Sequence, residues 1–278
     1  EGATLHIEEG VKIIAVYDDI ADYILVKQGG KINAVGTPDK PIVMTSEKEE
    51  PGAWGGIHIC GRAHTNAEGG KGSSEIGGAV YGGNDDADNS GTLQYIRLEY
   101  TGFAFDEEHE ANGISFYGVG NGTIVDHCQA YKGSDDGFEF FGGSVNVSNL
   151  VAVSCSDDSF DWTEGWNGKG TNLVAYQEAE STLGYDCDCL MECDNNGSNN
   201  AATPVAHPVL KNLILVGNGG SKQGIRLRAG TEVEIDNAKV CGKGQPLTVE
   251  TALTENALKN GTSKLTNITL TSELSSKE

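Results

Sequence analysis

The chain has 278 residues, with 39 glycines, six prolines and a mean hydropathy of -0.33. Its net charge of -22, from 41 acidic and 19 basic residues, makes nucleic acid a poor partner, because phosphates need lysine and arginine to neutralise them. No run of about 18 apolar residues is present, so the sequence predicts no membrane-spanning segment.

In the first hundred residues, two features stand out. His58 lies between two isoleucines in a strand pattern, which predicts an outward-facing surface side chain. The stretch "DADNSG" at 86–91 places Asp86, Asp88 and Ser90 ahead of a glycine, as in the first half of a calcium loop. Its twelfth position is an arginine, so it is no EF-hand, and an Asx-rich turn is the alternative interpretation.

Seven later segments share a polar or ring-bearing residue that is followed by an alternating apolar strand. Their aligned positions are Tyr95, His127, Asn149, Asn172, Asn212, Asn237 and Asn267. The steps between them are 32, 22, 23, 40, 25 and 30 residues, so the unit is about 22–25 residues and the longer steps carry insertions. We expect the asparagines to stack as a ladder inside a turn, where their amides bond to one another.

A second set of short, glycine-punctuated strands lies between these segments. They cover 113–118, 137–143, 159–165, 189–193 and 224–230. Strands that recur at this spacing predict a solenoid of parallel strands, in which equivalent residues of neighbouring coils lie ~4.8 Å apart. A β-sandwich is the weaker alternative, because its hairpins impose no fixed coil length. Only 251–261 has a helical pattern, ending at Gly261.

Two of the second-set strands follow paired aspartates, in "SDDGFEFFGG" at 134–143 and "SDDSFDWTEG" at 156–165. The coil register predicts three columns of stacked acids. Asp135 lies by Asp157, Asp136 by Asp158, and Glu139 by Asp161, with Glu192 and Arg226 continuing the last column. Three interpretations remain open: a calcium site of hard oxygen ligands, a pair of catalytic carboxylates, or aspartates that cap turns by accepting from backbone amides.

The aromatic residues and the cysteines give less information about function. Trp162 and Trp166, with Tyr185 and Phe141, could form a sugar-stacking surface; the alternative is that Trp162 points into the core while Trp166 covers a loop. The seven cysteines are an odd number, so at least one thiol is free or pairs outside the chain. The cluster "CDCLMEC" lacks the spacing of a zinc ribbon.

Four stretches, at 25–46, 51–66, 81–102 and 134–143, resemble a family of secreted or surface-displayed bacterial right-handed parallel β-helix proteins. The resemblance covers roughly residues 1–230 and implies a pectate-lyase-like fold and an extracellular address. It implies no established reaction. A narrower likeness to the polygalacturonases rests on Asp135 and Asp136 at their aspartate pair and on Arg226 near their arginine motif. The chain lacks that family's acid one coil earlier and its histidine one coil later.

We therefore expect residues 1–278 to form a single all-β domain, a right-handed parallel β-helix with loop insertions, within a longer secreted protein. The expected function is non-catalytic, in adhesion, surface or matrix assembly, or glycan binding, with glycans, surface proteins or further copies as partners and calcium as the bound ion. The expected calcium ligands are Asp86, Asp88, Ser90, Asp135, Asp136, Asp157 and Asp158. The alternative is a lyase or glycoside hydrolase acting on acidic polysaccharide. Its catalytic residues would be Glu139, Asp161, Glu192 and Arg226. We also expect the insertions at 63–91 and 177–209 to cover much of the acidic face, because both are too long for bare turns.

Overall fold

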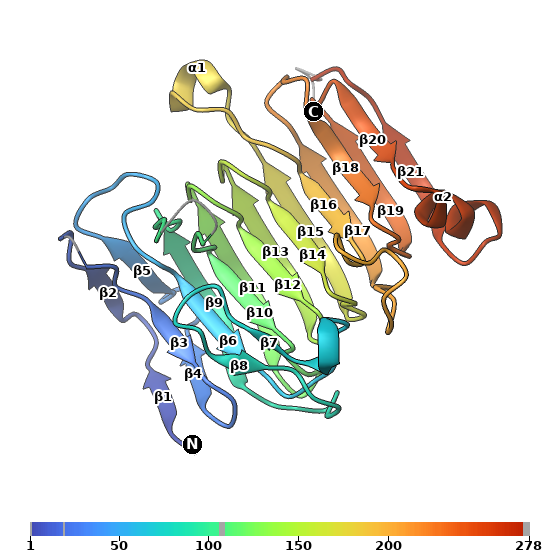
Figure 1. The fold of residues 1–278 in the computed structure, drawn as a ribbon. Coiled ribbons are helices and arrows are strands. Elements are labelled where there is room, and N and C mark those ends of the chain that lie inside the picture. Colours follow the sequence, from blue (N-terminus) through green and yellow to red (C-terminus); the bar gives the residue numbers. More distant parts are fainter. Residues whose placement is uncertain (1, 19, 106–108, 275–278) are drawn as a thin grey trace.

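The protein is a right-handed parallel β-helix in which the chain winds between two long sheets (Figure 1). The computed structural model describes residues 2–18, 20–105 and 109–274. Figure 1 shows the coils stacked along one axis, from the blue N-terminal end to the red C-terminal end. The solenoid predicted from the repeat spacing is confirmed.

Sheet A contains the longer strands. In spatial order they are β1 (Thr4–Ile7), β4 (Lys31–Val35), β9 (Gly91–Glu99), β11 (Ile124–Tyr131), β13 (Asn146–Val153), β15 (Lys169–Tyr176), β17 (Val209–Val216), β19 (Glu234–Cys241) and β21 (Lys264–Leu270). Two more strands, β2 (Lys12–Ala15) and β5 (Ile42–Ser46), pair with each other, and β5 also pairs with β9. All of these pairings are parallel.

Sheet B contains the shorter strands and carries the acidic residues. Its order is β3 (Ile24–Val26), β6 (Ile57–Cys60), β10 (Ile114–Tyr117), β12 (Phe138–Phe141), β14 (Phe160–Thr163), β16 (Met191–Asp194), β18 (Gln223–Arg228) and β20 (Gln245–Val249). The insertion between β6 and β9 adds a 3-10 turn at Glu68–Gly70 and an antiparallel hairpin of β7 (Gly72–Ser73) and β8 (Val80–Tyr81).

The aligned positions of the repeat form the predicted ladder along sheet A. Every one of the seven has a left-handed backbone, with φ between 51° and 65°. The Asn172 amide donates to Asn149 (2.9 Å), Asn212 donates to Asn172 (3.0 Å) and Asn237 donates to Asn212 (2.9 Å). Asparagine tolerates this conformation better than most residues do. At its end the ladder differs from the prediction, because Asn267 donates to Asp236 rather than to an asparagine.

The core runs along the inside of the solenoid, between the two sheets. The Phe116 ring stacks on Phe140 (5.0 Å between centroids), and Phe140 stacks on Trp166 (4.1 Å). Trp162 and Trp166 are each 1% exposed, so both belong to the core and provide no sugar-stacking surface. The expected helix is α2 (Ala252–Lys259), with Gly261 in a left-handed conformation just beyond its end. The other helix of the described residues is the single turn α1 (Glu180–Leu183).

The expectation for His58 is wrong, because its side chain is fully buried. It stands in the same column as Ser115 on the outer face of sheet B, as its alternation indicates. There, the rings of Tyr23 and Tyr117 pack against it, at 6.2 and 6.3 Å between centroids. Alternation predicted which way the side chain points, but covering residues decide whether that face is exposed.

Candidate functional site

The acidic residues of sheet B form a column on its outer face. The strand register places Glu139 opposite Asp161, Asp161 opposite Glu192, and Glu192 opposite Arg226. This is the order predicted from the sequence. Because the strands are parallel, each residue lies one coil spacing from the next, and the repeated turn before each strand brings the paired aspartates into adjacent columns.

The second aspartate of each pair caps the turn of the following coil. Asp136 Oδ1 accepts a hydrogen bond from the backbone N–H of Asp158 (2.8 Å), and Asp158 Oδ1 accepts one from the backbone N–H of Cys189 (2.6 Å). One coil earlier, Asn112 Oδ1 accepts from the N–H of Asp136 (3.2 Å). The turn-capping interpretation is therefore confirmed for Asp136 and Asp158, whose other carboxylate oxygen is left for further contacts.

A pocket of about 210 Å³ opens over these columns. Its lining, among the described residues, is entirely acidic. The seven side chains are Glu75, Glu110, Asp135, Asp136, Glu139, Asp157 and Asp161. We call this the acidic pocket. Asn112 Nδ2 donates to Glu139 Oε2 (2.6 Å) and so satisfies one oxygen of that carboxylate, but no basic side chain lines the pocket in the part of the chain that is described.

Several carboxylates are close enough to share one cation. Four groups of three residues bring their ligand atoms within 4.8 Å of one another. They are Asp135, Asp136 and Asp157; Asp136, Glu139 and Asp161; Asp158, Asp161 and Glu192; and Asp158, Asp188 and Cys189. Asp161 Oδ1 is enclosed and has no hydrogen-bond partner. Hard carboxylate oxygens are the ligands that calcium prefers, so the first three groups fit that ion.

Burial and mutual repulsion oppose ionisation of these acids. Burial, followed by the charge of Asp157, raises the pKa of Asp135 to about 7, and burial raises the pKa of Glu75 to about 7 as well. Burial, followed by neighbouring carboxylates, raises the pKa values of Asp136, Glu139, Asp158 and Asp161 well above the ordinary range. Without a cation, several of these groups therefore hold protons near neutral pH, whereas a bound cation would favour their ionised form.

On the C-terminal side, the acidic columns are followed by two arginines, because Arg226 lies opposite Glu192 and Arg228 lies opposite Asp194. Arg226 Nη1 contacts Glu192 Oε2 (2.9 Å) and its Nε contacts Glu250 Oε1 (3.0 Å), and Arg228 pairs with Glu192 and Asp194. The hydrogen bond to Glu250 is the largest cause of a raised pKa for Arg226. An arginine held in this way keeps its proton and is a poor base.

The 86–91 stretch lies apart from this pocket. Asp86 Oδ1 accepts from the backbone N–H of His64 (3.1 Å) and contacts its ring Nδ1 (2.7 Å). The Ser90 hydroxyl donates to Asp88 Oδ2 (3.3 Å). Among the described residues, neither aspartate joins a group of three ligand atoms within 4.8 Å. The acids named from the sequence thus divide into a clustered set on sheet B and a separate turn.

Sequence reasoning missed four members of the site. Glu75 comes from the β7–β8 hairpin and Glu110 from the segment before β10, and neither has a place in the coil repeat. Asp188 and Cys189, by contrast, precede Glu192 at the same spacing as Asp157 and Asp158 precede Asp161. Counting back from each aligned acid would have identified both.

The 63–91 insertion covers part of the acidic face, as expected. Ala79 and Tyr81 pack on Cys60, Tyr117 and Phe141. Residues of the 177–209 insertion meet it, because the Asn66 amide donates to Asn195 Oδ1 (2.8 Å) and the Asn196 amide donates to Asn66 Oδ1 (3.0 Å). The acidic pocket opens on the same face beside this cover.

Six of the cysteines are buried free thiols, namely Cys60, Cys128, Cys155, Cys187, Cys189 and Cys193. None of the helices that the structure describes is long and apolar enough to cross a membrane.

The family model described as the pectate-lyase-like beta helix domain matches residues 1–278. Neither a curated protein nor a solved structure matches the chain.

Proposed function

The chain belongs to the family of pectate-lyase-like β-helix domains, and on this premise we propose that it acts as a non-catalytic extracellular module stabilised by calcium. Domains of this family are typically extracellular. The partners that we propose are glycans or other surface proteins, with assembly of several copies as a further form of the same role.

The acidic pocket is the single observation that carries this proposal. Seven carboxylates line about 210 Å³, and three groups of acids place ligand oxygens within the reach of one ion. Like charges this close raise one another's pKa unless a cation offsets them. Calcium takes six to eight oxygen ligands in flexible geometry, so it can use carboxylates of two coils and keep positions for water or for an anionic partner group.

Three observations weigh against turnover. Arg226, the residue that a lyase would use as its base, is held by Glu192 and Glu250. Trp162 and Trp166 are buried, so they cannot stack on a sugar. The insertion that carries Tyr81 covers part of the face along which a polysaccharide chain would lie.

Hydrolysis remains the second candidate, because Glu139 and Asp161 lie opposite each other on adjacent strands. Their nearest ligand oxygens are within 4.8 Å. An inverting pair needs roughly 6.5–9.5 Å between its carboxyl groups, and a retaining pair about 5–5.5 Å. If the protein is a hydrolase, this spacing favours the retaining course.

The two candidate functions predict different results for calcium binding and for turnover of acidic polysaccharides. Isothermal titration of the chelated protein with calcium is expected to show binding, and a screen of acidic polysaccharides is expected to show no reducing-end release and no unsaturated product. Turnover that disappears in Glu139→Gln or Asp161→Asn, with the fold intact by circular dichroism, would establish the enzyme instead. Absence of calcium binding at millimolar concentration would remove the proposed ion.

A further inference from the structure

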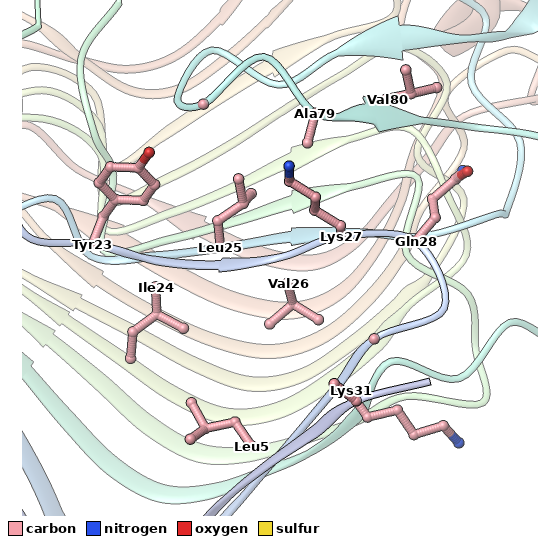
Figure 2. Close-up of a pocket in the computed structure, with 13 residues that line it drawn as sticks. Leu5, Tyr23, Ile24, Leu25, Val26, Lys27, Gln28, Lys31, Ala79 and Val80 are labelled. Atoms are coloured by element: carbon pink, nitrogen blue, oxygen red, sulfur yellow. The ribbon is translucent and has the colours of Figure 1, made fainter. Parts of the chain in front are cut away.

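One lysine is buried where the turns of two successive coils meet. Of the described lysines, only Lys243 is buried, and it is 0% exposed. By contrast, Lys27 and Lys31, which line a hollow of about 820 Å³ beside β1 and β3, are exposed (Figure 2). A lysine is almost never fully buried unless its amino group has partners, so the groups around the Lys243 amine indicate what it can do.

The strand register places Lys243 beside Asn218. The last residues of β17 and β19 lie opposite each other, and Asn218 and Lys243 each follow two residues later. A backbone hydrogen bond from Gly219 N–H to Gly242 O (2.7 Å) holds the two turns together. Equivalent positions of successive coils lie ~4.8 Å apart, so the long lysine side chain reaches the asparagine of the neighbouring turn.

The Lys243 amine contacts the side-chain amide of Asn218. Its Nζ donates to Asn218 Oδ1 (3.0 Å) and to the backbone O of Cys187 (2.9 Å). Because a C=O bond is about 1.2 Å long, the amide carbon of Asn218 lies within about 4.2 Å of the amine nitrogen. Reacting atoms need to be about 3–3.5 Å apart, so a shift of about 1 Å brings the amine to the carbon.

Two further groups hold the Asn218 amide as an acyl transfer requires. The Gly220 N–H donates to Asn218 Oδ1 (3.0 Å), where it stabilises negative charge that develops on this oxygen. Asn218 Nδ2 donates to Asp186 Oδ1 (2.7 Å), so a carboxylate lies at the nitrogen that would leave. These groups surround the place where a Cβ of residue 220 would lie, at 3.0 Å for the amide oxygen, 3.6 Å for the carboxylate oxygen and 3.7 Å for the amine.

The charge states of the lysine and the aspartate suit the same reaction. Burial lowers the pKa of Lys243, against the opposing charge of Asp186, and so favours the neutral amine that can attack. Burial raises the pKa of Asp186, but hydrogen bonds from the Asn218 amide and the Cys187 N–H outweigh this effect and lower it overall. Asp186 is therefore ionised at neutral pH and can accept a proton.

We propose that Lys243 and Asn218 form an intramolecular isopeptide bond, with Asp186 as the catalytic group that transfers the proton. Lys243 Nζ attacks Asn218 Cγ, and the carbonyl oxygen takes negative charge beside the Gly220 N–H. Asp186 accepts the proton that Nζ loses and delivers it to Asn218 Nδ2. The bond between Cγ and Nδ2 then breaks and ammonia leaves.

This reaction exchanges one amide for another. Nothing is oxidised or reduced, so it needs no cofactor and no co-reactant. The product joins the turns that follow β17 and β19 and closes a loop between residues 25 positions apart in the chain. None of the three side chains lines the acidic pocket, so the cross-link is independent of calcium binding there.

The Asn218–Gly219 sequence offers a second way to lose ammonia. Attack by the Gly219 backbone nitrogen on the same amide would give a succinimide, which has the same mass as the isopeptide product. The hydrogen bond from Gly219 N–H to Gly242 O opposes that attack. A succinimide also joins no two parts of the chain, so the two products are distinguished by digestion.

Mass spectrometry of the folded 278-residue chain, after reduction, tests the proposal. The intact mass is expected to be lower than the sequence mass by one ammonia. Trypsin does not cut after an acylated lysine, so the digest is expected to contain peptides 212–222 and 240–259 joined through Asn218 and Lys243. A succinimide would give the same intact mass without joined peptides.

Three variants, each checked for folding by circular dichroism, identify the reacting groups. Lys243→Arg keeps a cation but removes the amine, and it is expected to show the full sequence mass. Lys222→Arg is the matched control, because Lys222 Nζ pairs with Asp188 (2.7 Å) and not with an amide, and it is expected to link as the parent does. Asp186→Ala is expected to slow linkage at least about 100-fold, so that freshly purified protein is largely unlinked.

The digest of the parent decides the proposal even if a variant fails to fold. The proposal is overturned if that digest holds no joined peptides after prolonged incubation at neutral pH. It is also overturned if Lys243→Arg loses ammonia to the same extent as the parent, or if Asp186→Ala links as fast as the parent.

Discussion

Asp136 Oδ1 accepts a 2.8 Å hydrogen bond from the backbone N–H of Asp158, the residue that occupies the same place one coil later. Asp158 repeats the contact with the N–H of Cys189 at 2.6 Å. The second aspartate of each pair thus has a structural role, because its side chain caps the turn of the next coil. The repeat also gathers charge, because it places the carboxylates of successive coils next to one another.

Two substitutions of Asp158 distinguish the effect of its hydrogen bond to the Cys189 N–H from the effect of its buried charge. Asp158→Asn keeps an oxygen that can accept from Cys189 N–H and removes a buried carboxyl, so the calcium-free protein is expected to be as stable as the parent or more so. Asp158→Ala leaves that buried N–H without an acceptor and is expected to cost about 1–3 kcal/mol of unfolding free energy. Urea unfolding in a chelator measures both. Equal losses in the two variants would contradict the capping role.

The asparagine ladder gives a second stability prediction. Asn172 donates to Asn149 and accepts from Asn212, and its backbone is left-handed with φ of 58°. Asn172→Ala loses both hydrogen bonds and strains the backbone, so a loss of roughly 1–3 kcal/mol is expected. Asn172→Gly loses the same bonds without the strain and is expected to lose less. Thermal melts of the two variants give the comparison, and a glycine variant less stable than the alanine variant would be inconsistent with a strained left-handed site.

Unfolding of the calcium-free protein should depend on pH with a defined sign. The folded-state pKa values of Asp135 and Glu75 are raised to about 7, chiefly by burial. Between the ordinary carboxyl pKa of about 4 and that value, the folded state binds more protons than the unfolded state, so stability falls as pH rises. Calcium binds the ionised acids and is expected to stabilise most at the upper end of this range. Melting temperatures from pH 4 to 8, with chelator and with calcium, show both trends. A chelated protein that gains stability over this interval would refute the assignment.

The sequence predicts the site residues that follow the coil repeat, and it does not predict those that lie outside the repeat. The step of 22 residues between Glu139 and Asp161 equals one coil, so their adjacency could be read from sequence spacing alone. Glu75 and Glu110 could not, because insertions outside the register bring them to the pocket by tertiary packing. The burial of His58 depends in the same way on Tyr23 and Tyr117.

Calcium binding should distinguish the acidic pocket from the separate turn at Asp86. Asp161 Oδ1 is enclosed and has no hydrogen-bond partner, and Asp161 belongs to two of the groups whose ligand atoms lie within 4.8 Å. Asp161→Asn removes one charge from both groups, so we expect calcium affinity to fall by at least about tenfold, or 1.4 kcal/mol. At a calcium concentration 100 times the dissociation constant, the parent is expected to gain about 2.7 kcal/mol of stability.

Asp86→Asn is the matched control, because it also removes one carboxylate. Its side-chain oxygen can still accept from the His64 backbone N–H, and Asp86 lines no part of the acidic pocket. In isothermal titration with calcium, run for the parent and both variants, we expect the affinity of Asp86→Asn to stay within about twofold of the parent. That is a change well below 1.4 kcal/mol. If Asp86→Asn loses affinity while Asp161→Asn keeps it, calcium is held by the 86–91 turn. The carboxylates of sheet B would then be stabilised by protonation and by the caps that Asp136 and Asp158 provide, which requires no metal ion there.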